Sequence, residues 1–345
     1  MPILALWTCL ASFPSVAVVG ENDVETQRWF VRERMPFVVR NLRCNVPPLA
    51  ALDSVAAFRD IDGVFVSRAC AGAGSANETG FGRTTNFGRA SRLLRAGVRG
   101  YFQALMDRAA AQQLDARCRP IGMLFDRNLT RCLGAREHSR LLRSYGWRAL
   151  FFGTRGTGMP LHTDELLTHT WSLQVEGAKR FRFCPPAAIT TSLIRERLAN
   201  DGVTLNMSLF DRVDASNSGS GDSGPSSSQG SDGRGLRACR GVTARRGDFV
   251  YWPSDWWHET LNGDPSDRVD GRCTGSGPAH SHSRAPLSIS YSGMHVDDSV
   301  RYRFASDVLD ATADGRFDDK LSHAFIRCLG LSDIVSNPGV DGKTN

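Results

Sequence analysis

The sequence predicts a mainly β domain with flanking helices, and three observations lead to this prediction. Short segments such as 171–176 and 287–291 alternate apolar and polar residues with the period of two that is typical of a strand. Turns rich in Gly and Pro, for example 156–160, separate such segments. With 345 residues, of which 41% are hydrophobic, the chain can bury one large core, so we expect a single substantial domain.

Residues 18–146 are expected to form a mixed region of helices and strands ahead of the β core. Asn22 can cap a helix that ends before Pro36, because the residue before a proline resists the helical conformation. The other elements predicted here are a strand at 37–42, a helix at 49–58, a strand at 63–67, a Gly-rich loop at 72–82, a long helix at 91–112, a strand at 121–125 and a helix at 135–144. The residues of the long helix that we interpret as core packing are Tyr101, Phe102, Leu105 and Met106.

Residues 147–305 are expected to form the β core, and 306–345 a helical tail. The alternating run 171–177 and the strand 179–183 are interpreted as an antiparallel hairpin. The segment 214–235 consists almost entirely of Ser, Gly, Asp and Asn, which favours a disordered insertion.

A second polar loop is predicted at 263–283, and an amphipathic helix at 321–331. The loop contains His280 and His282, whose spacing invites a metal assignment. Because they lie among Ser, Gly and Pro without a strand pattern, we interpret them as surface residues.

His162 and Asp164 are the strongest candidates for a metal site. In a strand, residues two apart point to the same face, so both can bind one ion while Thr163 faces away. A distant histidine, which we assign to His258, completes a set of two imidazoles and one carboxylate. On one face of an octahedron, this set is the arrangement of non-haem Fe(II) oxygenases, and the open positions suit a chelating co-substrate and dioxygen.

Lys179 is notable because the chain contains 39 Arg and only 3 Lys. It begins a predicted strand, on the same face as Phe181 and Phe183. A compact ammonium on an apolar face favours the binding of the far carboxylate of a small diacid in a narrow pocket. The alternative is a side chain whose amine reaches the surface while its stem packs.

Two stretches have the spacing of cupin-barrel motifs. The first has Gly156, five residues and His162; the second has Gly247, five residues, Pro253, four residues, His258, three residues and Asn262, with Asp255 where cupins usually have Gly. On these stretches and on 34–40, the chain resembles JmjC-domain proteins of the cupin superfamily, which are related to Fe(II)- and 2-oxoglutarate-dependent hydroxylases. It is most similar in appearance to a small stand-alone subgroup that resides in the lumen of the endoplasmic reticulum.

The resemblance implies a double-stranded β-helix (jelly-roll) barrel that binds Fe(II) through His162, Asp164 and His258. It also implies that 2-oxoglutarate is the co-substrate, with its distal carboxylate on Lys179, and that the substrate is a protein or peptide to be hydroxylated. The sequence differs from the family pattern at two positions that concern the co-substrate. Met159 stands where many members have Thr, and Ser172 stands where others have Asn. Ser290, in the late strand, is a candidate to supply a hydroxyl instead.

Other functions stay open beside hydroxylation. The two departures allow a catalytically weak or inactive interaction protein of the secretory pathway. Lysine demethylation is disfavoured because the sequence has no chromatin-reading zinc cluster, and a cupin isomerase is disfavoured by Asp164 together with Lys179. The sequence leaves the hydroxylated residue undetermined, and a homodimer through the C-terminal helix is a further alternative.

The N-terminus predicts a signal peptide, residues 1–17, with cleavage after Ala17. An apolar run at 3–10 precedes small residues, although no Lys or Arg comes before it. Loss of Cys9 would leave eight cysteines, an even number that suits disulfides. The glycosylation acceptors by pattern are Asn77, Asn128 and Asn206. These features favour the endoplasmic reticulum lumen or the secretory pathway over the alternative, a cytoplasmic or nuclear location.

The formal net charge of +6 comes from scattered Arg residues and not from a basic block. It is therefore weak evidence for nucleic-acid binding, and we expect none. Apart from the predicted signal, no segment is long and apolar enough to span a membrane, so we expect no membrane anchor after its removal.

Overall fold

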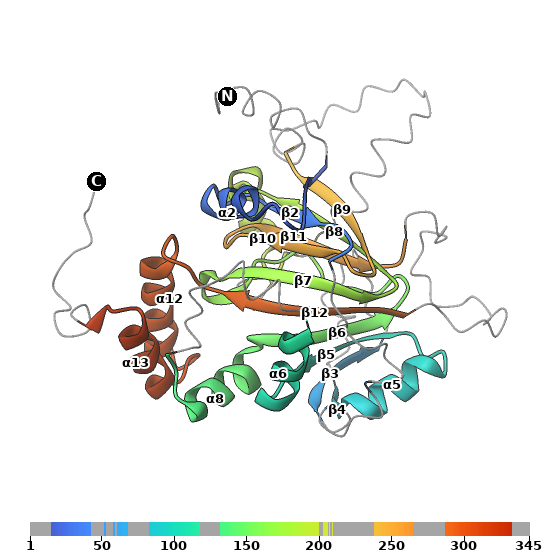
Figure 1. The fold of residues 1–345 in the computed structure, drawn as a ribbon, viewed down its shortest axis with the longest axis horizontal. Helices are drawn as coiled ribbons and strands as arrows, with labels where there is room; N and C mark the ends of the chain where they lie inside the picture. The colour runs from blue at the N-terminus through green and yellow to red at the C-terminus, as the bar shows by residue number, and fades with distance from the viewer. Residues whose placement is uncertain are drawn as a thin grey trace.

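Two hydrogen-bonded β-sheets form the centre of the computed structural model, and helices flank them (Figure 1). The structure describes residues 15–42, 52, 58, 61–67, 83–117, 132–199, 203–205, 207, 209, 238–264 and 287–332. Within these ranges, no helix has the length and apolar character needed to cross a membrane.

The larger sheet has nine strands. In spatial order they are β1 (Ala17–Val19), β2 (Phe37–Val39), β10 (Phe249–Trp252), β7 (His169–Glu176), β12 (Leu287–His295), β6 (Arg148–Thr154), β5 (Gly100–Leu105), β3 (Asp62–Ser67) and β4 (Arg83–Asn86). β1 and β2 are parallel, and all other neighbours are antiparallel. The strands that precede residue 146 therefore extend the same sheet as the strands of the core.

The smaller sheet consists of β11 (Trp257–Asn262), β8 (Ala178–Cys184) and β9 (Arg240–Arg245), all antiparallel. Its buried face packs on the larger sheet, because the rings of Phe181 and Phe183 lie 5.9 and 5.6 Å from the ring of Trp252. Within the described residues, the two ladders do not close into one barrel. The predicted barrel is therefore confirmed only as a mainly β fold of two packed sheets with flanking helices.

The predicted hairpin of 171–177 and 179–183 is wrong. Both strands form, but β7 pairs with β10 and β12, whereas β8 pairs with β9 and β11. Gly177 makes the connection with φ +66°, and a Cβ there would collide with the carbonyl oxygen of Leu287, so the turn requires glycine. The chain thus crosses between sheets, which brings Lys179 of β8 opposite β12.

The predicted long helix at 91–112 is also wrong. The segment forms α5 (Phe87–Arg95), then β5, then α6 (Arg108–Arg117). Gly97, with φ +87°, ends α5 in the left-handed conformation that favours glycine. In β5 the period is two: Phe102 is buried in the core, whereas Tyr101 and Leu105 line a cavity between the sheets.

The remaining helices include those predicted at the start of the chain, at 135–144 and at 321–331. They are α2 (Val24–Arg32), α8 (Ala135–Tyr145), α9 (Thr191–Arg197), α12 (Arg301–Ala313) and α13 (Asp319–Cys328). The cap of α2 is Asp23 and not Asn22, since the Asp23 carboxylate accepts a hydrogen bond from the amide of Thr26. α12 and α13 lie beside α8 at one end of the larger sheet (Figure 1).

Two disulfides join segments that are distant in the sequence. Cys184 at the end of β8 is bonded to Cys239 just before β9, and Cys132 ahead of α8 is bonded to Cys328 at the end of α13. A disulfide is typical of proteins that fold in an oxidising compartment.

The first described residues already belong to the packed fold. Ser15 forms a β-bridge with Gly241, and Val16 is only 3% exposed. The predicted cleavage after Ala17 therefore falls inside β1. Several other predictions lie wholly or largely outside the described residues: the helix at 49–58, the loop at 72–82, the strand at 121–125, the insertion at 214–235, the loop at 263–283 with His280 and His282, and the acceptors Asn77, Asn128 and Asn206.

Candidate metal centre and adjoining cavity

Backbone pairing places the two candidate histidines side by side. The amide of His162 donates to the carbonyl of His258 at 2.9 Å, and the amide of His258 donates back at 2.8 Å. Their rings lie 4.1 Å apart between centroids. The expected strand at 162–164 is only an isolated bridge, because Thr163 pairs with Val203 and Asp164 precedes a short 3-10 turn, η2 (Glu165–Leu167).

Each candidate histidine is oriented by a hydrogen bond at Nδ1. Nδ1 of His162 lies 2.8 Å from the carbonyl oxygen of Pro160, and Nδ1 of His258 lies 3.1 Å from that of Trp256. A carbonyl can only accept, so each Nδ1 carries a proton, and in the neutral form of the ring Nε2 is the nitrogen with the lone pair. Burial, and then the neighbouring His162, lowers the pKa of His258 to about 4, so this ring is neutral near pH 7.

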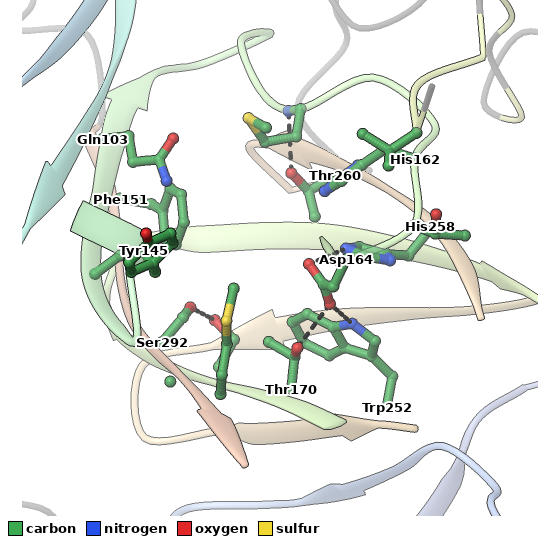
Figure 2. A pocket seen from close by; sticks show the side chains of 18 of the residues that line it. Gln103, Tyr145, Phe151, His162, Asp164, Thr170, Trp252, His258, Thr260 and Ser292 are labelled. Carbon is green, nitrogen blue, oxygen red and sulfur yellow. Dashed lines mark hydrogen bonds and ion pairs between the residues drawn. The ribbon is translucent and has the colours of Figure 1, made fainter. Parts of the chain in front are cut away.

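Asp164 is held by two donors on one of its oxygens (Figure 2). The hydroxyl of Thr170 donates to Oδ2 at 2.6 Å, and the indole N–H of Trp252 donates to the same atom at 2.9 Å. Oδ1 remains directed at the histidines, 3.6 Å from Nε2 of His258. Burial alone would raise the pKa of Asp164, but the histidines and both hydrogen bonds outweigh it and hold the pKa below its usual range.

His162, Asp164 and His258 form a group that could hold a metal ion. One ligand atom from each residue lies within 4.8 Å of the others. Two imidazole Nε2 atoms and Oδ1 of the carboxylate are ligand atoms of the kind that divalent iron binds. The donor set therefore fits a metal with two imidazoles and one carboxylate.

Asp255 stands in the turn before His258, where the cupin pattern usually has Gly. Its φ is +69°, in the left-handed region that favours glycine, which explains the usual residue. The Asp255 carboxylate lies 2.9 Å from Arg34 and 2.7 Å from Arg303. These two ion pairs fix the turn that leads into β11.

Lys179 lies in the same cavity as the metal-binding group. Its ammonium donates to Oγ of Ser290 at 3.1 Å and to the hydroxyl of Tyr101 at 3.3 Å. The rings of Phe151 and Phe181 also lie near it, with Nζ 5.2 and 5.8 Å from their centroids. Burial lowers the pKa of Lys179 to about 7, and no carboxylate of the described residues forms an ion pair with it.

The two predicted serines occupy different places. Ser290 contacts Lys179, as described above. Ser172 lines the cavity but accepts a hydrogen bond from Ser292 at 2.9 Å and does not contact Lys179. Ser290 was predicted to supply the hydroxyl that Met159 lacks, and the structure places this hydroxyl beside Lys179, on β12.

Four polar residues that bond to Asp164, Lys179 or Tyr101 were not predicted from the sequence to belong to this site. They are Tyr101, Thr170, Trp252 and Thr260. Thr260 hydrogen-bonds the hydroxyl of Tyr101 and accepts from the amide of Met159 at 3.1 Å. A signal for Thr260 was present, since it stands two residues after His258 and thus on the same face of β11. Thr260 therefore supplies a hydroxyl beside Met159, which has none.

The cavity has a volume of about 390 Å³, and its lining includes Lys179, the metal-binding group and the end of α8. In Figure 2, Gln103, Tyr145 and Phe151 lie across it from His162 and His258. The volume falls within the range typical of small-molecule sites. One cavity thus contains a candidate metal site, a buried cation and additional space.

A comparison with protein families matches residues 23–268 to the model of the cupin-like domain. This range covers most of the chain and includes His162, Asp164, Lys179 and His258. No curated protein matches the sequence. The chain belongs to the cupin-like domain family.

Proposed function

We propose that this protein is an Fe(II)- and 2-oxoglutarate-dependent oxygenase that hydroxylates a protein or peptide. The observation that carries the proposal is the position of Lys179. A buried ammonium without a carboxylate partner among the described residues lies in the same cavity as two imidazoles and a carboxylate that could bind a metal. A buried charge is costly unless it is paired, so this arrangement favours a ligand that brings an anion.

The metal would be held by Nε2 of His162, Nε2 of His258 and Oδ1 of Asp164. When bound with its co-substrate, Fe(II) would catalyse the cleavage of dioxygen, so that one oxygen atom enters a substrate C–H bond and the other enters 2-oxoglutarate, which leaves as succinate and carbon dioxide. Thr170 and Trp252 keep Asp164 ionised and direct Oδ1 towards the histidines. Cupin-like folds with such a donor set are compatible with oxygenase chemistry.

The far carboxylate of 2-oxoglutarate would pair with Lys179 and accept hydrogen bonds from the hydroxyls of Tyr101 and Ser290, which already contact the ammonium. The rings of Phe151 and Phe181 make this end of the cavity apolar. In such surroundings a charge pair is stronger than in water, because the local dielectric is low. These side chains would thus hold the co-substrate in one orientation.

The experiment that tests the proposal is anaerobic purification with Fe(II), followed by titration with 2-oxoglutarate. Chelation of Fe(II) by the keto acid gives a weak visible charge-transfer band, and we expect this band to appear and saturate. Succinate without a keto group is the matched control and should give no band. Failure of 2-oxoglutarate to produce the band in iron-loaded protein would contradict the proposal.

The alternative is an interaction protein that keeps the fold and does not turn over. The observation in its favour is Met159, which lacks the hydroxyl found in many JmjC proteins at this position. The hydrogen bond from its amide to Thr260 weakens this objection, because Thr260 brings a hydroxyl to the same wall. Lysine demethylation stays the disfavoured reaction.

We also propose that the protein enters the secretory pathway. The two disulfides support this location, because cytosolic proteins rarely retain disulfides. The test is the N-terminal sequence and the endoglycosidase sensitivity of protein from its own cells. Cleavage would remove the apolar run at 3–10. The predicted mature start is Val18, but the structure packs Ser15 and Val16 into the fold, so a start at or before Ser15 would support the same location. An intact Met1 on a cytosolic protein would contradict this proposal.

A further inference from the structure

The metal and the co-substrate would together use both of the charged side chains, other than histidines, that line the cavity among the described residues. Among the described residues that line it, the only formally charged side chains other than the histidines are Asp164 and Lys179. Under the proposed function, the first binds the metal and the second binds the co-substrate. No anionic side chain of this lining is then left for a substrate.

The wall across from His162 and His258 includes Gln103 of β5, Tyr145 at the end of α8 and Phe151 of β6 (Figure 2). These side chains are uncharged, and so are the other residues that β5, α8 and β12 contribute to the lining of the cavity, including Leu105, Ser144, Ser292 and Met294. Tyr145 is fixed, since its hydroxyl accepts from the amide of Asp318 at 2.7 Å and its ring packs 4.2 Å from that of Phe317. A cationic group that enters this space would therefore find no anionic side chain of the described lining to pair with, because the proposed function assigns Asp164 to the metal.

Gln103 is the residue of this wall that can recognise a substrate most specifically. It lies in β5 two residues after Tyr101 and two before Leu105, and all three line the cavity. Its side chain is half-buried, and its carboxamide forms no hydrogen bond with the part of the chain that the structure describes. A carboxamide offers one acceptor and two N–H donors, which together match an amide of the partner.

We propose, on the basis of the proposed oxygenase function, that the substrate is an uncharged residue of a peptide, positioned by hydrogen bonds between one of its amides and the carboxamide of Gln103. The amide belongs either to the peptide backbone or to a side-chain carboxamide. Lysine, methyl-lysine and arginine are rejected, because each would bury a charge in a cavity whose described lining has no free anionic partner for it. Gln103 is a specificity-determining residue that acts on the substrate and not on the metal.

The test uses the full chain with Mn(II), which does not turn over, and 2-oxoglutarate. Fluorescent peptide pools share one flanking composition and differ at a central residue: Leu, Asn, Gln, Lys, trimethyl-lysine or Arg. Binding is measured by fluorescence anisotropy. Pools with an uncharged centre should bind at least about tenfold more tightly than pools with a cationic centre.

Gln103→Leu removes the carboxamide with little change in volume, and Gln113→Leu on the exposed face of α6 is the matched control. Gln103→Leu should weaken binding of uncharged pools roughly two- to tenfold, the effect of one or two lost hydrogen bonds. An equal loss for all uncharged centres identifies the backbone amide, and a loss confined to Asn and Gln identifies the side-chain carboxamide. Gln103→Glu should improve binding of the cationic pools, because it supplies the missing anion.

Preferred binding of cationic pools by the wild-type protein, or unchanged binding in Gln103→Leu, would overturn the inference. The charge-transfer band with Fe(II) distinguishes a failure of the oxygenase proposal from a failure of the inference on Gln103. If the band forms while cationic peptides bind best, the oxygenase proposal stands and the inference on Gln103 fails. If the band does not form, both fail.

Discussion

The indole N–H of Trp252 donates a hydrogen bond of 2.9 Å to Oδ2 of Asp164. Trp252 ends β10 in the larger sheet, while Asp164 lies beside a bridge to β11 in the smaller one, so this contact joins the two sheets at the candidate metal centre. The Trp252 ring also lies 4.9 Å from the ring of His258. One side chain thus contacts two of the three candidate ligands.

Substitution of the groups that hold Asp164 is expected to weaken metal binding without removing a ligand. Trp252→Phe and Thr170→Val each delete one hydrogen bond to Oδ2, and partners of this kind typically contribute about 10- to 100-fold in metal affinity. The measurement is Fe(II) affinity by anaerobic competition with a chelator. Trp29→Phe on α2 and Thr84→Val on β4 are the matched controls and should bind as wild type. Wild-type affinity in both site variants would show that Asp164 needs no such support.

Removal of any one ligand is expected to abolish tight Fe(II) binding. His162→Ala, Asp164→Ala and His258→Ala each leave two donors, and the described residues offer no replacement group in the cavity. Metal content and circular dichroism of the purified variants should show lost iron with a retained fold. His323→Ala on the exposed face of α13 is the control. Normal iron content in all three variants would mean that the metal, if any, binds elsewhere.

Lys179 is expected to destabilise the ligand-free fold. Burial lowers its pKa from an ordinary value near 10.5 to about 7, so the unfolded chain binds more protons than the folded chain between these values. The folded state is therefore penalised most below about pH 7, and the penalty disappears as the pH rises towards 10. Lys179→Met should raise the free energy of unfolding by up to about 5 kcal/mol near pH 6 and by much less near pH 10.

Denaturant unfolding across this pH range measures the effect, and Lys320→Met on the exposed surface of α13 is the matched control. A gain that is the same at both ends of the range would indicate better packing instead of a removed charge. A lower stability of Lys179→Met than of wild type would contradict the prediction that the buried amine destabilises the fold.

The same pKa predicts how co-substrate binding depends on pH. A carboxylate pairs with the ammonium form of Lys179, which predominates below about pH 7. Above this pH, binding must be accompanied by proton uptake, so the Kd for 2-oxoglutarate should rise by up to about tenfold per pH unit. Lys179→Arg stays protonated and should bind more weakly at neutral pH but with little dependence on pH. Calorimetric titrations in buffers of different ionisation enthalpy would reveal the proton uptake, and its absence would refute this explanation.

The metal-binding group could be predicted from the sequence because its signal is local. His162 and Asp164 are two residues apart, and His258 stands at a fixed spacing from Gly247 and Pro253. The strand that contains Lys179 has a clear period of two, and the structure buries Lys179 on the face of Phe181. Short-range spacing therefore indicated the candidate site even though the pairing of the strands was mispredicted.

Contacts that depend on how distant strands meet could not be predicted. Tyr101 reaches Lys179 only because Gly97 ends a helix and lets β5 begin, and the apolar residues of this segment fit both periods. The roles of Thr170 and Trp252 depend on β7 and β10 being neighbours, which no local pattern encodes. The crossing at Gly177 from one sheet to the other is likewise a property of the tertiary fold.

The most direct test of the oxygenase account compares 2-oxoglutarate binding by iron-loaded wild type and Lys179→Ala, followed through the charge-transfer band. Loss of a desolvated charge pair typically costs about 2 to 5 kcal/mol, which corresponds to roughly thirty- to several-thousand-fold in affinity. The account predicts a loss of this size in Lys179→Ala, with Fe(II) affinity close to that of wild type. Equal 2-oxoglutarate affinity in the two proteins, or no binding by either, would contradict it.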